Sequence, residues 1–155
     1  MKKYIFIHAL IISFVLLPFS FVSIAEEQGG GEVLVSPTGH EISGNQWLFV
    51  IGIDSYISFP RLNTSVNDAK SLKDILLKRY HFDEYHAIAL YNEEATRRNI
   101  LGKLRYLTRR VGPEDSVIIF YSGHGALDSD MREGSWIPVE GTTDDTSSWI
   151  SNKYR

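Results

Sequence analysis

Short, continuous apolar runs alternate along the chain with segments in which apolar residues recur every three or four positions. The runs at residues 47–53, 87–91 and 117–121 have the length and continuity of strands buried on both faces. Between them, residues 66–80 and 97–111 carry apolar side chains at helical spacing. This order of strand, helix, strand, helix and strand predicts an α/β fold with right-handed crossovers and a parallel sheet.

Polar residues set the expected helix ends. Thr64 or Ser65 can cap the first helix, Thr96 can cap the second, and Gly112 with Pro113 stops it. Ligands of such sheets gather where strands end at their carboxyl edge. The segments expected to carry chemistry are therefore residues 54–68, 92–95 and 122–126.

The N-terminal segment is typical of a secretory signal peptide. Lys2 and Lys3 precede an apolar run over residues 4–22, and small residues ending at Ala25 come before acidic ones. The run is long enough that an uncleaved membrane anchor is the alternative. We expect the chain to be exported, to a periplasmic or extracellular location. Residues 26–45, rich in Gly, Ser and acidic residues, are expected to form a flexible leader.

Composition narrows the classes of function. The 155 residues are 43% hydrophobic and 23% charged, which is a globular composition, and they include no cysteine. Disulfide frameworks, thiolate zinc sites and iron–sulfur clusters are thereby excluded for this sequence. A net charge of −3 without a basic stripe argues against nucleic acid and favours a peptide or protein as the partner.

The third apolar run leads directly into Ser-Gly-His-Gly at residues 122–125. A histidine at the carboxyl edge of a buried strand can act as a general base or acid, and the amide of Gly125 can donate to an oxyanion. The alternative is structural: the glycines only make a turn and His124 caps the sheet. The remaining histidines, among them His81 and His86 beside a loop, are expected to have no catalytic role.

Residues 117–125 resemble the histidine block of the caspase-like cysteine peptidases, the group of caspases, metacaspases and their bacterial relatives. Residues 48–54 resemble the first strand of that family, and residues 62–69 resemble the following loop and helix start. Downstream, residues 136–141 resemble a Val-Pro-Val-Asp type segment, and residues 149–151 look like the start of a further helix. The resemblance implies a caspase-like parallel-sheet sandwich, truncated to a β-α-β-α-β core, with residues 46–155 as an incomplete catalytic domain.

By this resemblance His124 is the catalytic histidine and Gly125 contributes its amide to the oxyanion. Asp68 matches an acidic position of the specificity pocket in metacaspase-type members, where a carboxylate selects Arg or Lys. The alternative for Asp68 is a first-turn acid that stabilises a helix N-terminus. Arg61 raises the opposite possibility of an acidic substrate residue. We favour the basic one because the sequence around Asp68 fits the family better.

The resemblance implies no cofactor. Metacaspases often bind calcium through an acidic pair, whose expected position near Ser151 and Asn152 is uncharged here. We therefore expect no metal site. The sequence does not predict an oligomeric state, and a membrane is a partner only if the N-terminal segment stays uncleaved.

The nucleophile of the family is missing from these residues. Its cysteine stands about 50 residues beyond the histidine, and Arg155 comes sooner. We expect the chain to be the N-terminal part of an exported caspase-like endopeptidase that ends before the strand carrying the cysteine. The alternative is a genuine short product that serves as a non-catalytic caspase-like module for binding a peptide or protein.

Overall fold

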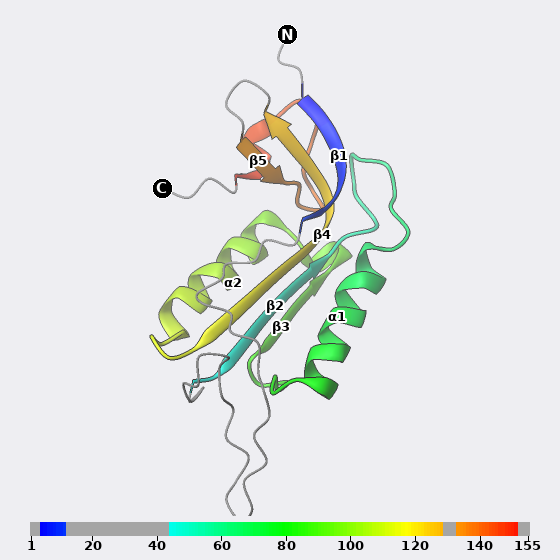
Figure 1. The fold of residues 1–155 in the computed structure, drawn as a ribbon. Coiled ribbons are helices and arrows are strands. Elements are labelled where there is room, and N and C mark those ends of the chain that lie inside the picture. Colours follow the sequence, from blue (N-terminus) through cyan, green and yellow to red (C-terminus); the bar gives the residue numbers. More distant parts are fainter. Residues whose placement is uncertain (1–3, 12–43, 129–132, 152–155) are drawn as a thin grey trace, which may run out of the picture.

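A computed structural model of the chain describes residues 4–11, 44–128 and 133–151 (Figure 1). It has two helices and a mixed sheet, so the predicted α/β class is confirmed. The elements in chain order are β1 Tyr4–Ile11, β2 Gln46–Gly52, α1 Ser65–Arg79, β3 Ala87–Tyr91, the 3-10 turn η1 Asn92–Glu94, α2 Arg97–Arg110, β4 Ser116–Asp128, β5 Glu133–Trp136, the 3-10 turn η2 Thr146–Ser148 and β6 Ile150–Ser151.

The predicted parallel core forms one side of the sheet, with β3 at its edge. The strand order is β3-β2-β4-β5-β6, and β2 lies parallel to both β3 and β4. Gly52 at the end of β2 is in register with Tyr91 of β3 and Ser122 of β4. The carboxyl ends of β2 and β3 therefore meet beside the middle of β4, where the Ser-Gly-His-Gly segment begins.

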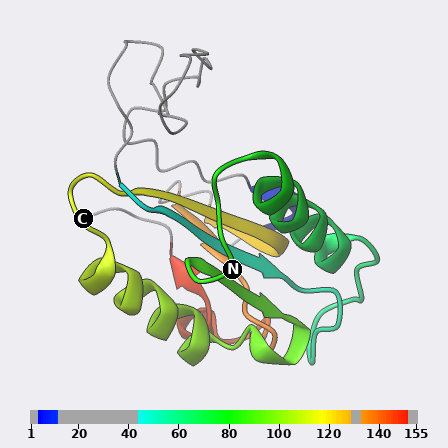
Figure 2. The same ribbon diagram turned by 90° about the horizontal axis from the view of Figure 1, so that it is seen from below.

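Strand β2 is buried on both faces because a helix covers each side of the sheet (Figure 2). Phe49 and Ile51 pack in one core cluster with Ile100 of α2. Leu48 and Val50 belong to a second cluster on the α1 side. The alternation of side chains along a strand thus explains why this run is apolar at every position.

Helix α1 approaches the end of β2 closely at Gly52. A Cβ at this position would lie 2.7 Å from the Ser65 carbonyl oxygen and 2.8 Å from the Val66 Cα. The absence of a side chain lets the first turn of α1 rest on the sheet.

The two helices are capped differently. Thr96 accepts a hydrogen bond from the Asn99 amide at 3.2 Å, as the sequence predicts. Thr64 stands at the N-cap of α1 without a side-chain capping bond. The Asp54 carboxylate accepts instead from the amides of Ser65 at 2.8 Å and Val66 at 3.4 Å.

Two expectations about the second half of the chain are wrong. The strand expected to end at residue 121 continues through the glycines to Asp128, because β5 pairs antiparallel with residues 125–128. Residues 149–151 do not start a helix, since Ile150–Ser151 forms strand β6 beside β5.

The N-terminal segment contributes β1, which pairs antiparallel with β4 from Tyr4 opposite Asp128 to Ile11 opposite Tyr121. The pairing is that of the uncleaved chain and does not test whether residues 1–25 are removed. The signal peptide at residues 1–25 therefore stays a prediction. Most of the expected leader, residues 26–43, and residues 152–155 lie outside the described part. Over the residues that are described, no helix is both long and apolar enough to cross a membrane.

Candidate active site

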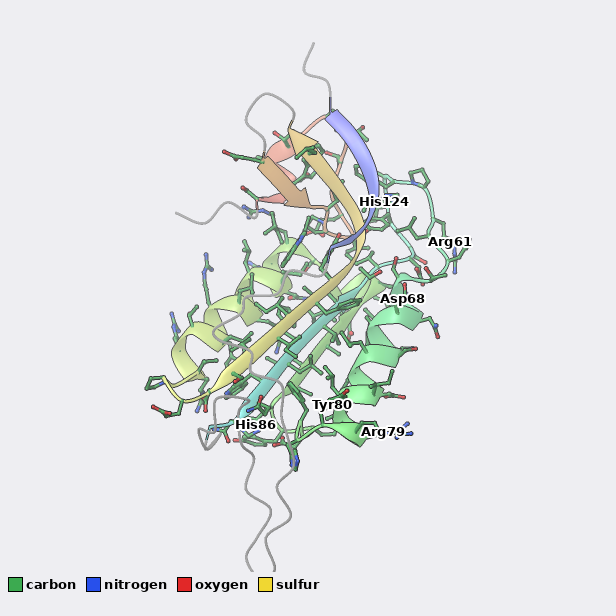
Figure 3. All side chains as sticks on the ribbon, viewed as in Figure 1. Arg61, Asp68, Arg79, Tyr80, His86 and His124 are labelled. Carbon is green, nitrogen blue, oxygen red and sulfur yellow. The ribbon has the colours of Figure 1, made fainter. Side chains whose placement is uncertain are left out.

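The candidate site lies where the loop after β2, residues 53–64, crosses the middle of β4. Figure 3 shows His124, Arg61 and Asp68 at this end of the sheet, far from His86 at the other end. They come from β4, the loop and α1 respectively. The topology thus brings two of the three expected segments together, and the third joins them through Asn92.

His124 is held inside the molecule by that loop. It is 4% exposed, and its Nε2 lies 2.8 Å from the Pro60 carbonyl oxygen. A carbonyl can only accept, so Nε2 carries the hydrogen and Nδ1 is the basic nitrogen of the neutral ring. The rings of Tyr56 and Phe59 pack against the imidazole, with centroids 4.7 and 5.4 Å from it.

Two tyrosine hydroxyls contact the backbone of the same histidine. The His124 amide donates to the Tyr56 oxygen at 2.7 Å, and the Tyr121 hydroxyl lies 2.8 Å from the His124 carbonyl oxygen. The hydroxyls are 3.2 Å apart. Burial raises the pKa of Tyr56 to about 12 and that of Tyr121 well above its ordinary value. Both side chains therefore stay protonated at neutral pH.

The loop itself is anchored by polar groups at the ends of β2 and β3. The Asn92 side-chain oxygen accepts from the amides of Asp54 at 2.9 Å and Ser55 at 3.1 Å. Asn92 has a φ of 44°, in the left-handed region that asparagine tolerates better than most residues. The Leu62 amide donates back to the Asp54 carbonyl at 2.9 Å, which closes the loop.

Gly125 follows His124 in β4 and lies in two ladders. It is in register with Trp136 of β5 and with Ile7 of β1. The Gly125 amide is the group that the sequence assigns to the oxyanion. While β1 is in place, the backbone at Gly125 therefore has a paired strand on each side.

The two expected specificity residues lie on the surface near the loop. Arg61 is exposed and directly follows Pro60, whose carbonyl contacts His124. Asp68 is half-buried in the first turn of α1, where its amide donates to Thr64. This position is compatible with a role at the helix N-terminus and with a role toward a ligand.

Sequence reasoning missed the residues that hold the histidine. Tyr56 and Phe59 stand in a loop of mixed polarity without helical or strand periodicity, Tyr121 reads as a core residue, and Asn92 reads as a turn. The one available signal is the presence of two aromatic side chains in a loop that joins a strand to a helix. Among the described residues, no group of three or more His, Asp or Glu side chains is placed to hold a metal ion.

Comparison with known proteins places this arrangement in a family. Residues 48–146 match the family model described as "Metacaspase, peptidase C14 domain". The chain belongs to the metacaspase family. The expected resemblance to caspase-like peptidases is thereby confirmed, and the matched region includes His124, Asp68 and the loop after β2.

Curated metacaspases share this region at moderate identity. The chain is 31% identical over 104 residues to metacaspase-1 of Eremothecium gossypii, covering 61% of the chain and 23% of that protein. It is 37% identical over 89 residues to metacaspase-1 of Plasmodium falciparum, covering 52% and 14%. For metacaspase-2 of Arabidopsis thaliana it is 30% identical over 90 residues, covering 54% and 22%. The chain thus spans less than a quarter of each of these metacaspases.

Proposed function

We propose that this metacaspase chain is the histidine-bearing part of an exported cysteine endopeptidase that cleaves after a basic residue. The observation that carries the proposal is the contact between His124 Nε2 and the Pro60 carbonyl at 2.8 Å. It leaves Nδ1 as the nitrogen that takes up a proton. An imidazole oriented in this way by a second group is the recurring base of thiol and serine peptidases.

The reaction uses His124 twice. Nδ1 accepts the proton of a cysteine thiol, and the thiolate attacks the carbonyl carbon of the scissile bond. The Gly125 amide donates to the oxyanion that forms. As this intermediate collapses, the imidazolium gives its proton to the leaving amine, and water then releases the acyl group from sulfur. The 155 residues hold no cysteine, so the thiol comes from polypeptide beyond this sequence.

Export and site access are linked in this proposal. Removal of residues 1–25 as a signal peptide takes away β1, which pairs with β4 at Gly125. The edge of β4 beside His124 is then open to a substrate or to another strand.

Asp68 supports a preference for Arg or Lys in the substrate. Its carboxylate is half-buried at the N-terminal turn of α1, next to the loop that carries Pro60. A partly desolvated carboxylate attracts a guanidinium or ammonium more strongly than a fully solvated one. Arg61 is exposed at the same end of the molecule and would favour an acidic residue instead.

The first experiment assays the chain as it stands. We expect no turnover of reporter peptides with Arg, Lys or Asp before the scissile bond, because no thiol is present. Turnover that His124→Ala abolishes would contradict the need for a further cysteine.

The second experiment sequences the locus beyond the codon for Arg155. A continuation with an apolar strand that ends in Asp-x-Cys or Ala-Cys supports the peptidase. A confirmed stop codon, together with a soluble product that melts cooperatively, would instead favour a non-catalytic module that binds a peptide or protein.

Specificity is tested in the cysteine-containing polypeptide. Asp68→Ala should raise KM for Arg and Lys reporters and lower kcat/KM by about tenfold or more, as expected when a charge-assisted hydrogen bond is lost. Asp74→Ala is the control, since Asp74 lies on the same helix and forms an exposed ion pair with the Lys78 ammonium at 3.6 Å. Unchanged specificity in Asp68→Ala would assign Asp68 to the helix end alone.

A further inference from the structure

The ladder between β4 and β5 opens at His124. Its register pairs Gly125 with Trp136, so the next pair along the hairpin is His124 and Ile137. The Ile137 amide does donate to the His124 carbonyl at 3.0 Å. The His124 amide, however, donates to the Tyr56 hydroxyl at 2.7 Å instead of to β5.

A second hydroxyl occupies the same opening. Tyr121 Oη lies 2.8 Å from the carbonyl oxygens of both His124 and Ile137. Carbonyls only accept, so the one hydroxyl hydrogen of Tyr121 is directed to them. In the 3.2 Å contact between the hydroxyls, Tyr56 must therefore be the donor.

The donors and acceptors form one directed chain. It runs from the His124 amide to Tyr56, from Tyr56 to Tyr121, and from Tyr121 back to the His124 carbonyl. Both backbone groups of the histidine are thus fixed by side chains from separate elements, the loop after β2 and the strand β4. The two peptide groups that flank the His124 Cα are therefore each held by a tyrosine hydroxyl, which limits rotation about the backbone bonds of His124.

Packing keeps the two hydroxyls in place. Tyr121 is fully buried and stacks on Trp136 with ring centroids 5.0 Å apart and planes 3° from parallel. Gly123 leaves the space that the hydroxyls fill, since a Cβ there would lie 2.3 Å from Tyr56 Oη and 2.7 Å from Tyr121 Oη.

We propose that Tyr56 and Tyr121 are positioning residues that fix the His124 backbone so that its Nε2 stays bonded to the Pro60 carbonyl. The catalytic meaning of this role rests on the proposed peptidase function, but the positioning itself does not. Without the Tyr56 hydroxyl, the His124 amide loses its acceptor and the peptide rotates toward the Ile137 carbonyl. The imidazole then moves relative to Pro60.

The test is NMR spectroscopy on the 155-residue chain labelled with nitrogen-15. In the wild type we expect a slowly exchanging Hε2 resonance for His124 and a protected His124 amide. Tyr56→Phe should remove the Hε2 resonance and speed exchange of that amide about tenfold or more, the change that corresponds to one lost hydrogen bond. Tyr80→Phe, which changes an exposed tyrosine of the same chain, should alter neither signal.

A folded Tyr56→Phe variant that keeps both signals would overturn the proposal. If that variant does not fold, Tyr121→Phe is read in the same way, since it removes the hydroxyl and keeps the ring that stacks on Trp136. If neither variant folds, the two tyrosines are essential to the fold rather than positioning residues, and the proposal is rejected.

A kinetic measurement separates this inference from the proposed function. In the cysteine-containing polypeptide, Tyr56→Phe should lower kcat with little change in KM, because the ring that lines the site remains. An active His124→Ala variant would refute the peptidase role of His124 and leave the spectroscopic result intact. Altered His124 signals with an unchanged kcat would leave the positioning intact and would refute only its importance for catalysis.

Discussion

Two histidines lie at opposite ends of the parallel strands, and their surroundings differ in kind (Figure 3). His86 directly precedes β3, and its Nδ1 lies 2.8 Å from a carboxylate oxygen of Asp83. His124 lies in β4 and has a backbone carbonyl as the partner of Nε2. By the usual picture of a catalytic imidazole backed by a carboxylate, His86 would be the more conspicuous candidate.

The reach of the contacts distinguishes the two residues. Asp83 is three positions before His86, is 59% exposed, and also accepts from the His86 amide, so the pair closes a local turn. The hydrogen bond to His86 lowers the pKa of Asp83 below its ordinary value. The His124 contacts span more than 60 positions of sequence, to Pro60 and Tyr56. The candidate site is therefore distinguished by long-range contacts that hold the histidine in place. The chemical type of the hydrogen-bond partner, carboxylate or carbonyl, is the weaker criterion.

The residues around His86 form structural contacts, which are ring packing and hydrogen bonds to the backbone. Its ring meets the Trp47 ring edge-on, with centroids 4.6 Å apart. The Trp47 indole donates to the Asp115 carboxylate at 3.0 Å, and that carboxylate also accepts from the amides of Gly112 and Asn45. This end of the sheet joins the chain segments that enter β2 and β4, and we expect it to contribute to stability without contributing to catalysis.

The largest expected difference between the two ends is catalytic. In the polypeptide that supplies the thiol, His124→Ala should lower kcat by about 10²–10⁴-fold, the range for removal of a general acid or base. His86→Ala at the other end should leave kcat nearly unchanged. Measuring both variants with one reporter peptide makes the comparison, and equal losses would remove the distinction drawn between the two histidines.

A smaller difference is expected in stability. Gly123→Ala places a Cβ against the two tyrosine hydroxyls and should lower the free energy of unfolding by about 1–3 kcal/mol, the usual cost of overpacking. Gly112→Ala, at the other end, places a Cβ 3.7 Å from the nearest Asp115 oxygen and should change stability by at most about 1 kcal/mol. Urea unfolding of both variants measures this difference in stability. Equal midpoint concentrations of urea would show that the two tyrosine side chains can move aside without loss of stability.

The third and smallest difference is the pH dependence of the stability that Asp115 contributes. The pKa of Asp115 lies below its ordinary value because the Gly112 amide, then Asn45 and Trp47, donate to the carboxylate. Its stabilising contribution is present above the ordinary value of 3.8 and is lost as the pH falls through the lower folded value. Asp115→Asn should therefore cost about 1 kcal/mol at pH 7 and less at pH 2. A cost that is the same at both pH values would show that charge plays no part in this contact.

Local pattern was enough to predict the parallel core. Continuous apolar runs identify buried strands because a strand between two helices has no wet face, and β2 has the expected burial on both sides. Thr96 was predicted as an N-cap from residue type alone, and it caps α2. The strand that carries His124 was predicted too short, because its second half is held by β5 and not by its own pattern.

Residue patterns alone are enough to predict the α/β core, the family and His124 as the candidate catalytic residue. These follow from apolar periodicity and from a motif whose letters are contiguous. The contacts that hold this histidine, to the Pro60 carbonyl and to the hydroxyls of Tyr56 and Tyr121, emerge only in the folded arrangement of the chain. The reason is physical, since a hydrogen bond between distant segments depends on the path of the backbone, and no local pattern of residue types encodes that path.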